Sequence, residues 1–336
     1  MDAKSHLAFN LCRHSPLLAL TVISLFMLGG CASSDGPSCQ EPFQLSWSNQ
    51  RQLQKDVETL SSPPFEGRKT NTKGAAAARE YLIVRMLQSG LVPWQRNFDQ
   101  EFEYEYQFSK HRGYNLVGMK LADNPTKKWR VIVAHYDHLG MKGSRYYPGA
   151  DDNASGIAAM LAIASHANTQ SMPTNLLFIA TDAEEPGLFG SKALVDLLTN
   201  KTSHPTINDI ELVINLDMIG HPARGNSIYL EGRRGFAQFD QLEQTLESTV
   251  GLCIRANHPP EAGKSIQRVD WLRASDHYPF YRAGVPWLYF GVPPHPDYHQ
   301  MSDTADKIDM NFLAAVTETA FKLLIIDSYL LDKSKK

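Results

Sequence analysis

Basic runs, internal repeats and interdomain linkers are scarce in this 336-residue sequence, and each shortage excludes a function or a domain organisation. Lysine and arginine total 33 against 36 acidic residues, with a short basic run only at residues 333–336, so the sequence predicts no nucleic-acid binding. No repeat, low-complexity block or Pro/Gly-rich linker interrupts the chain after residue 46, which predicts a single domain over 47–336. The composition, 43% hydrophobic and 21% charged, is ordinary for a globular protein.

The first thirty residues have the pattern of an export signal. Lys4 and Arg13 precede an apolar stretch over 16–30 that is shorter than a usual membrane span. The sequence LGGC at 28–31 resembles a bacterial lipoprotein processing box, with Cys31 as the lipidated residue; an ordinary N-terminal anchor helix is the alternative. We therefore expect a signal peptide over 1–30 and a tether over 31–46. Ala32 replaces the aspartate associated with inner-membrane retention, which favours a lipid anchor in the outer membrane, facing the periplasm of the cell envelope.

Cysteine is scarce as well, with four in the chain. Cys12 would leave with the signal peptide and Cys31 would be acylated, so Cys39 and Cys253 remain. An oxidising periplasm would allow them to pair. Spacing alone equally allows two separate thiols.

Apolar segments with strand and helix patterns alternate along the rest of the chain. This alternation predicts an α/β fold, a three-layer αβα sandwich with a central mixed, largely parallel sheet. Helices are expected over 47–62, 73–90, 154–168, 188–200, 235–251 and 310–331. Strands are expected over 115–122, 127–137, 175–182, 211–220, 227–232 and 285–292.

Acidic and imidazole side chains follow three of the apolar strands. His135 and Asp137 end the first, Asp182, Glu184 and Glu185 follow the second, and Asp217 ends the third. The loop segments GADDNASG at 149–156 and HPDYHQMSDT at 295–304 add further candidates. Because the carboxyl ends of strands in an open α/β sheet form its ligand crevice, we expect these groups to converge.

So many carboxylates in one crevice would repel one another without cations. Nitrogen and oxygen donors without thiolate suit Zn²⁺, with Mn²⁺ or Co²⁺ as substitutes. The set is large enough for two metal ions, which act together in co-catalytic sites.

These motifs, in this order, resemble the M28 family of zinc peptidases and its co-catalytic aminopeptidases. The resemblance runs from PFEGRKTNTKGAAAAREYLIVRMLQSGLVPW at 64–94 to the YHQMSDTADKID region. It implies two zinc ions per chain, one held by His135 and Asp217 and the other by Glu185 and His299. It also implies that Asp152, rather than Asp151, bridges the ions and that a cis peptide bond follows Asp152.

The resemblance gives the remaining candidates different tasks. It implies that Glu184 is the general base, which takes a proton from water and passes it to the leaving amine. Asp137 is expected to accept the ring N–H of His135. Tyr298 either hydrogen-bonds the developing oxyanion or packs on the site wall. We expect Ser275–His277 to support the wall, and His138, His221 and His295 to act as hydrogen-bonding or packing residues.

The leading hypothesis is a dinuclear zinc aminopeptidase that acts on peptides in the cell envelope. A zinc carboxypeptidase and a single-zinc glutaminyl cyclase on the same scaffold are the alternatives, together with a non-catalytic envelope binding module. His135 speaks against the cyclase, because it matches the extra ligand of a second metal. A carboxypeptidase would need a cation for the substrate carboxylate, for which the sequence offers five arginines: Arg233, Arg234, Arg255, Arg273 and Arg282.

Overall fold

The computed structural model describes residues 42–200, 204–256 and 270–333. The expected lipoprotein signal and Cys31 therefore lie outside the described residues, as does Cys39. Cys253 takes part in a disulfide. Within the described ranges, none of the helices combines the length and the apolarity needed to cross a membrane.

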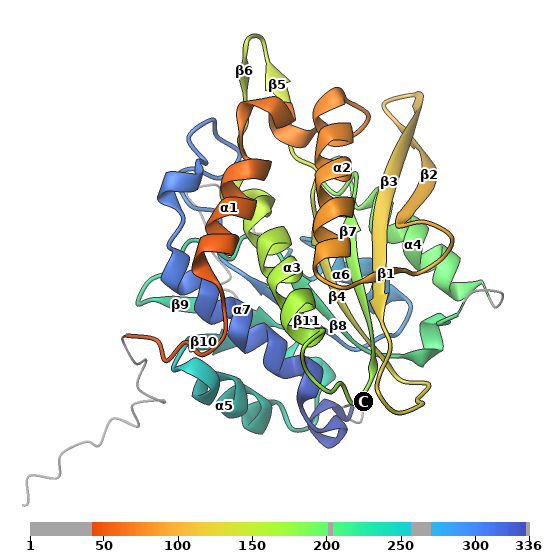
Figure 1. Cartoon of the computed structure of the whole chain (residues 1–336), viewed down its shortest axis with the longest axis vertical. Coiled ribbons are helices and arrows are strands. Elements are labelled where there is room, and N and C mark those ends of the chain that lie inside the picture. The colour runs from red at the N-terminus through yellow and green to blue at the C-terminus, as the bar shows by residue number, and fades with distance from the viewer. Residues whose placement is uncertain (1–41, 201–203, 257–269, 334–336) are drawn as a thin grey trace, which may run out of the picture. The chain divides into compact units, whose positions relative to one another are not determined.

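A nine-stranded mixed sheet forms the centre of the fold (Figure 1). Its order is β1-β3-β7-β4-β8-β11-β9-β10, with β2 paired to β3. The middle strands β7, β4, β8 and β11 are parallel, whereas β3 joins β7 and β9 joins β11 in antiparallel fashion. The strands are β1 Val92–Pro93, β2 Asp99–Tyr106, β3 Ser109–Lys120, β4 Trp129–His135, β7 Asn175–Thr181, β8 Ile210–Leu216, β9 Ser227–Glu231, β10 Cys253–Ala256 and β11 Trp287–Gly291, with a separate hairpin of β5 Met141–Lys142 and β6 Arg145–Tyr146.

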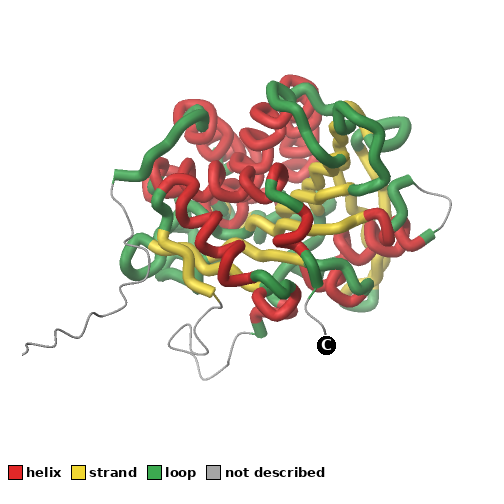
Figure 2. The backbone as a smooth tube through the Cα atoms, turned by 90° about the horizontal axis from the view of Figure 1, so that it is seen from below, coloured by secondary structure: helices red, strands yellow, loops and turns green. Residues whose placement is uncertain are grey.

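Helices cover both faces of this sheet, which gives the three layers expected from the sequence (Figures 1 and 2). Successive side chains of a strand point to opposite faces. On β4, Ile132 and Ala134 join one core cluster, whereas Val131 and Val133 join the other. Both faces are therefore apolar, as a buried parallel strand requires. The helices are α1 Gln50–Leu60, α2 Lys73–Gln88, α3 Gly156–Ala167, α4 Phe189–Thr199, α5 Phe239–Val250, α6 His277–Arg282 and α7 Met310–Ile325.

Most expected elements are confirmed, and the differences lie mainly at their ends. The helix expected over 47–62 begins at Gln50, where the Asn49 side chain accepts the Gln52 N–H and caps it. The helix expected over 235–251 begins at Phe239, after a separate 3₁₀ turn. The sequence did not predict β1, β2, β10, the β5–β6 hairpin or α6. These elements are short or strongly polar, so their apolar periodicity is weak.

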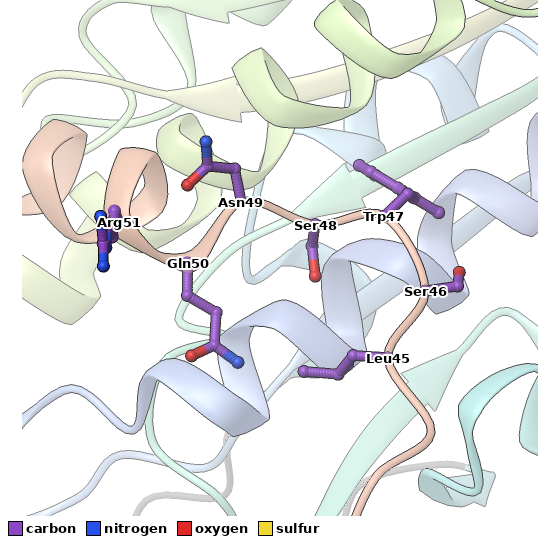
Figure 3. Close-up of a pocket in the computed structure, with 7 residues that line it drawn as sticks. All are labelled: Leu45, Ser46, Trp47, Ser48, Asn49, Gln50 and Arg51. Atoms are coloured by element: carbon purple, nitrogen blue, oxygen red, sulfur yellow. The ribbon is translucent and has the colours of Figure 1, made fainter.

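Residues 42–49 form an extended segment before α1, which we call the N-terminal strap. Glu318 of α7, 1% exposed, accepts hydrogen bonds from the backbone N–H groups of Ser46, Trp47 and Ser48. It also accepts from both serine hydroxyls. The Trp47 ring stacks on His166 of α3 at 4.0 Å. Figure 3 shows the pocket that residues 45–51 line beside this contact; none of the candidate site residues lines it.

Candidate metal centre

The candidate ligands come from the carboxyl ends of the central strands and the loops beside them. His135 is the last residue of β4, and Asp217 directly follows β8. Glu185 follows β7, and His299 follows β11. Because β7, β4, β8 and β11 are parallel, these ends lie at one edge of the sheet, as the sequence predicted.

Asp152 lies between two groups of donors. Its Oδ1 is 3.4 Å from His135 Nε2, which is also 3.4 Å from Asp217 Oδ1. Its Oδ2 is 3.1 Å from His299 Nε2, which is also 3.1 Å from Glu185 Oε2. The two oxygens of one carboxylate therefore face two separate nitrogen and oxygen clusters, a donor set that fits zinc.

Asp152 sits in an irregular turn, residues 150–155, directly before α3. The peptide bond between Asp152 and Asn153 is cis, as the resemblance implied. Gly149 begins the turn with a φ of 59°, and a Cβ there would lie 2.3 Å from the Asp152 carbonyl oxygen. This position therefore needs glycine both for its backbone conformation and for space.

The buried guanidinium of Arg68 binds the backbone of the same turn. It donates to five backbone carbonyls, those of Leu60, Tyr136, Pro148, Gly149 and Asp152. Burial lowers the pKa of Arg68 to about 10, so it remains a cation at neutral pH. One side chain thus links the turn after β4 to the turn that presents Asp152.

The carboxylate of Asp152 stays ionised in this setting. Burial alone raises the pKa of a carboxyl group, but hydrogen bonds from His135 and His299 lower the pKa of Asp152 well below its usual value. An ionised carboxylate with a free electron pair on each oxygen is the state that bridges two cations.

Asp137 makes a different contact from the expected one. The backbone carbonyl of Asp137, not its carboxylate, lies within hydrogen-bond distance of His135 Nδ1, at 3.1 Å. The carboxylate oxygen is 3.8 Å from that nitrogen and instead accepts the N–H groups of Glu184 and Glu185, at 3.0 and 3.3 Å. The expected ring contact is therefore corrected, because two adjacent backbone donors draw the carboxylate toward the β7 turn.

Glu184 and Glu185 leave this turn toward different partners. The N–H groups of Gly187 and Leu188 both donate to the Glu184 carbonyl, so the chain turns at once after the pair. Glu185 contacts His299 and His138. Burial raises the pKa of Glu184 well above its usual value, His135 opposes the shift, and Asp276 and Asp217 reinforce it. A carboxylate with raised proton affinity is suited to accept a proton near neutral pH.

Tyr298 packs beside the donors, with its ring stacked on His299 at a centroid distance of 3.9 Å. Burial, followed by the charges of Asp152 and Glu185, raises the pKa of Tyr298. Its hydroxyl therefore keeps its proton and can donate a hydrogen bond.

The segment Ser275–His277, which we expected to support the site wall, contacts the ends of strands β7 and β8. Asp276 accepts the Thr181 hydroxyl in a short hydrogen bond, and Asn215 donates to the Ser275 hydroxyl at 2.8 Å. His277 stacks on Trp287 and Tyr289.

Asp151 and His295 form a separate polar pair near the centre. Asp151 accepts the Gly220 N–H at 2.6 Å and lies 3.1 Å from His295 Nε2, while His221 stacks on the His295 ring at 4.1 Å. His295 Nδ1 accepts the Asp297 N–H. Both ring nitrogens of His295 therefore lie within hydrogen-bond distance of a partner.

Comparisons with known proteins agree with this geometry. The profile described as peptidase family M28 matches residues 115–324. A glutaminyl-peptide cyclotransferase of Boiga irregularis is 28% identical over 294 residues, covering 77% of this chain and 76% of the relative. Aminopeptidase YwaD of Bacillus subtilis is 29% identical over 210 residues, covering 60% of this chain and 42% of that protein.

Solved structures of both activities share the fold. A zinc aminopeptidase from Bacillus subtilis has a TM-score of 0.66 at 17% identity, covering 84% of this chain and 96% of that one. A glutaminyl cyclase from Fimbriiglobus ruber has a TM-score of 0.66 at 21% identity, with the same two coverages, 84% and 96%. Because the family profile spans more than half of the sequence, the chain belongs to peptidase family M28.

Proposed function

We propose that this chain is a dinuclear zinc aminopeptidase, which hydrolyses the N-terminal residue of peptides. The observation that carries the proposal is the position of Asp152, whose two oxygens face two donor clusters. His135, Asp152 and Asp217 would hold one zinc, and Asp152, Glu185 and His299 the other. Zinc held there would supply Lewis acidity, which polarises the scissile carbonyl and lowers the pKa of a water molecule.

The chain's own residues would then move the protons. Glu184 would accept the proton of the attacking water and deliver it to the leaving amine. Asp137 would fix the backbone of Glu184 and Glu185 through their two N–H groups. Tyr298, whose hydroxyl keeps its proton, would donate to the oxygen that gains charge on the substrate.

Glutaminyl cyclisation is the second candidate function, and the likeness to cyclotransferases over 77% of the chain favours it. That reaction uses a single zinc in enzymes of this scaffold. The presence of His135 beside Asp152 and Asp217 favours two metals and therefore hydrolysis.

The structure offers less support for a carboxypeptidase. Three of the candidate arginines have partners of their own: Arg233 pairs with Asp240, Arg273 with Asp270, and Arg255 donates to the Arg224 carbonyl. Arg68 is buried and already donates to five backbone carbonyls. We therefore propose the free N-terminus, rather than the C-terminal carboxylate, as the end of the peptide that is recognised.

Peptide assays on the full chain test the proposal. Peptides with a free N-terminus should lose their first residue, N-acetylated copies should remain intact, and a chelator should stop the reaction. Cleavage of the acetylated copies at the same rate would contradict the aminopeptidase assignment. Loss of ammonia from N-terminal Gln peptides, without release of a residue, would establish the cyclase instead.

We also propose that Cys31 carries a lipid anchor that places the enzyme in the cell envelope, which labelling can test. Labelling of the full chain with a radioactive fatty acid should depend on Cys31 and disappear in Cys31→Ser. Equal labelling of both proteins would contradict the anchor.

A further inference from the structure

His138 lies three residues after His135, in the turn that follows β4. Its side chain is fully buried. Nδ1 lies 2.8 Å from Glu185 Oε1 and 3.8 Å from Asp152 Oδ2. The other nitrogen, Nε2, is also buried, and among the described residues no hydrogen-bond partner faces it. The polar contacts of the ring are therefore concentrated on Nδ1, which points into the cluster of Asp152 and Glu185.

Asp152 and Glu185 each lie between the two histidines His138 and His299, at distances near those between ligands of one ion. His299 Nε2 is 3.1 Å from both Asp152 and Glu185, and His138 Nδ1 is 3.8 and 2.8 Å from the same two carboxylates. A tetrahedral zinc with bonds of 2.0–2.1 Å separates its donors by about 3.3 Å. The two imidazole rings lie 5.8 Å apart at 66°, so they approach from different directions.

We propose that His138 Nδ1 is a fourth protein ligand of the Glu185 and His299 zinc. This inference rests on the proposed dinuclear centre. It gives the two metal positions different characters, because four protein ligands close a zinc site whereas three leave a position open. The cluster of His138, Asp152, Glu185 and His299 would hold its zinc with four protein ligands and therefore more tightly. The cluster of His135, Asp152 and Asp217 would keep the open position for water and substrate.

A competing explanation is that His138 only donates a hydrogen bond to Glu185 and so orients it. The two explanations differ in what His138→Asn should do. Its amide nitrogen lies close to the position of Nδ1 and can donate to Glu185, but an amide nitrogen has no free electron pair for zinc. The amide oxygen of asparagine is a poor substitute for imidazole, since protein zinc sites use thiolate, imidazole and carboxylate. Asparagine therefore replaces an orienting donor but not an imidazole ligand.

Zinc counting on the full chain under increasing chelator tests the proposal. The wild type should lose one zinc first and hold the second to much higher chelator concentrations. His138→Ala and His138→Asn should both weaken the retained zinc by on the order of 100-fold or more, beyond the 10–100-fold typical of losing an orienting partner. His111→Ala, at a partly exposed position of β3 outside the cluster, is the matched control and should behave as the wild type. Restored zinc retention in His138→Asn, or loss of both wild-type ions together, would overturn the proposal.

X-ray absorption at the zinc edge provides a test that needs no variant. With both sites loaded, the proposal expects three imidazoles shared by two zinc ions, and two imidazoles would refute it. Peptide hydrolysis enters neither measurement. Absence of aminopeptidase activity would therefore contradict the proposed function while leaving the assignment of His138 intact.

Discussion

Replacing Glu318 by glutamine should release the N-terminal strap from α7. The carboxylate of Glu318 accepts five donors: the N–H groups of Ser46, Trp47 and Ser48 and the two serine hydroxyls. Glutamine keeps one acceptor oxygen, but an NH₂ group, which cannot accept a hydrogen bond, takes the place of the other oxygen. If the oxygen stays at the Oε1 position, the Ser46 hydroxyl loses its acceptor, and the Ser46 N–H keeps only one of its two.

The expected cost follows from these contacts. A hydrogen bond to a charged group contributes about 1.5–3 kcal/mol; the hydroxyl bond of Ser46 is lost, and the remaining bonds lose their charge assistance. Because Ser46 is exposed, water replaces part of the loss. We therefore expect Glu318→Gln to lower the free energy of unfolding by about 2–4 kcal/mol. Ser46→Ala, which removes one of these donors, should cost about 1 kcal/mol.

Urea unfolding and amide hydrogen exchange at neutral pH measure the effect. The amides of residues 46–48 should lose protection first, because they are the groups that Glu318 binds. Glu80→Gln, on the exposed face of α2, makes the same charge change without a strap contact and serves as the control. Equal protection of residues 46–48 in Glu318→Gln and the wild type would refute the reasoning.

Further predictions concern pH, the metal centre and Arg68. Burial raises the pKa of Glu318, but hydrogen bonds from the strap outweigh burial and lower this pKa below its usual value of 4.5. The difference in unfolding free energy between the wild type and Glu318→Gln should therefore be full at neutral pH. In urea titrations it should shrink as the pH falls below about 4.5. Glu184→Gln should keep its zinc and lose about 10²–10⁴-fold in turnover, whereas Glu185→Gln should lose zinc affinity; equal zinc loss in both would contradict their separate roles. Chelation should abolish turnover, and added zinc should restore it. Arg68→Lys should lower the free energy of unfolding by about 3 kcal/mol or more in urea unfolding, because one ammonium group cannot reach all five carbonyls. An unchanged unfolding midpoint would contradict this role of Arg68.

The two glutamates after β7 illustrate how far local sequence reaches. Pro186 favours an extended conformation at Glu185 and Gly187 lets the chain turn at once, so the sequence predicts that the two carboxylates diverge. In the structure Glu185 contacts His299 while Glu184 lies among the charges of His135, Asp217 and Asp276. The partners come from other strands, so the identity of each contact depended on the sheet.

His138 and Asp137 show the limit of such reasoning. Both lie in the HYDH stretch that begins at His135, and a second histidine three residues on was the available signal for a further donor. Asp137 lies two residues after His135, so either its backbone carbonyl or its carboxylate could reach the His135 ring. The sequence alone could not distinguish the two contacts. The two N–H groups of Glu184 and Glu185 decided it.

The sequence by itself determined the fold class, most of the elements and the edge of the sheet at which the acidic and imidazole groups meet. It could do so because periodicity reveals buried strands and helices, and because parallel strands end at a common edge. Tertiary structure alone decided that Glu318 binds Ser46, 272 positions away, and that Trp47 belongs to the strap rather than to α1. Such contacts join segments that are distant in sequence, and no local pattern encodes which buried carboxylate will meet which backbone donors.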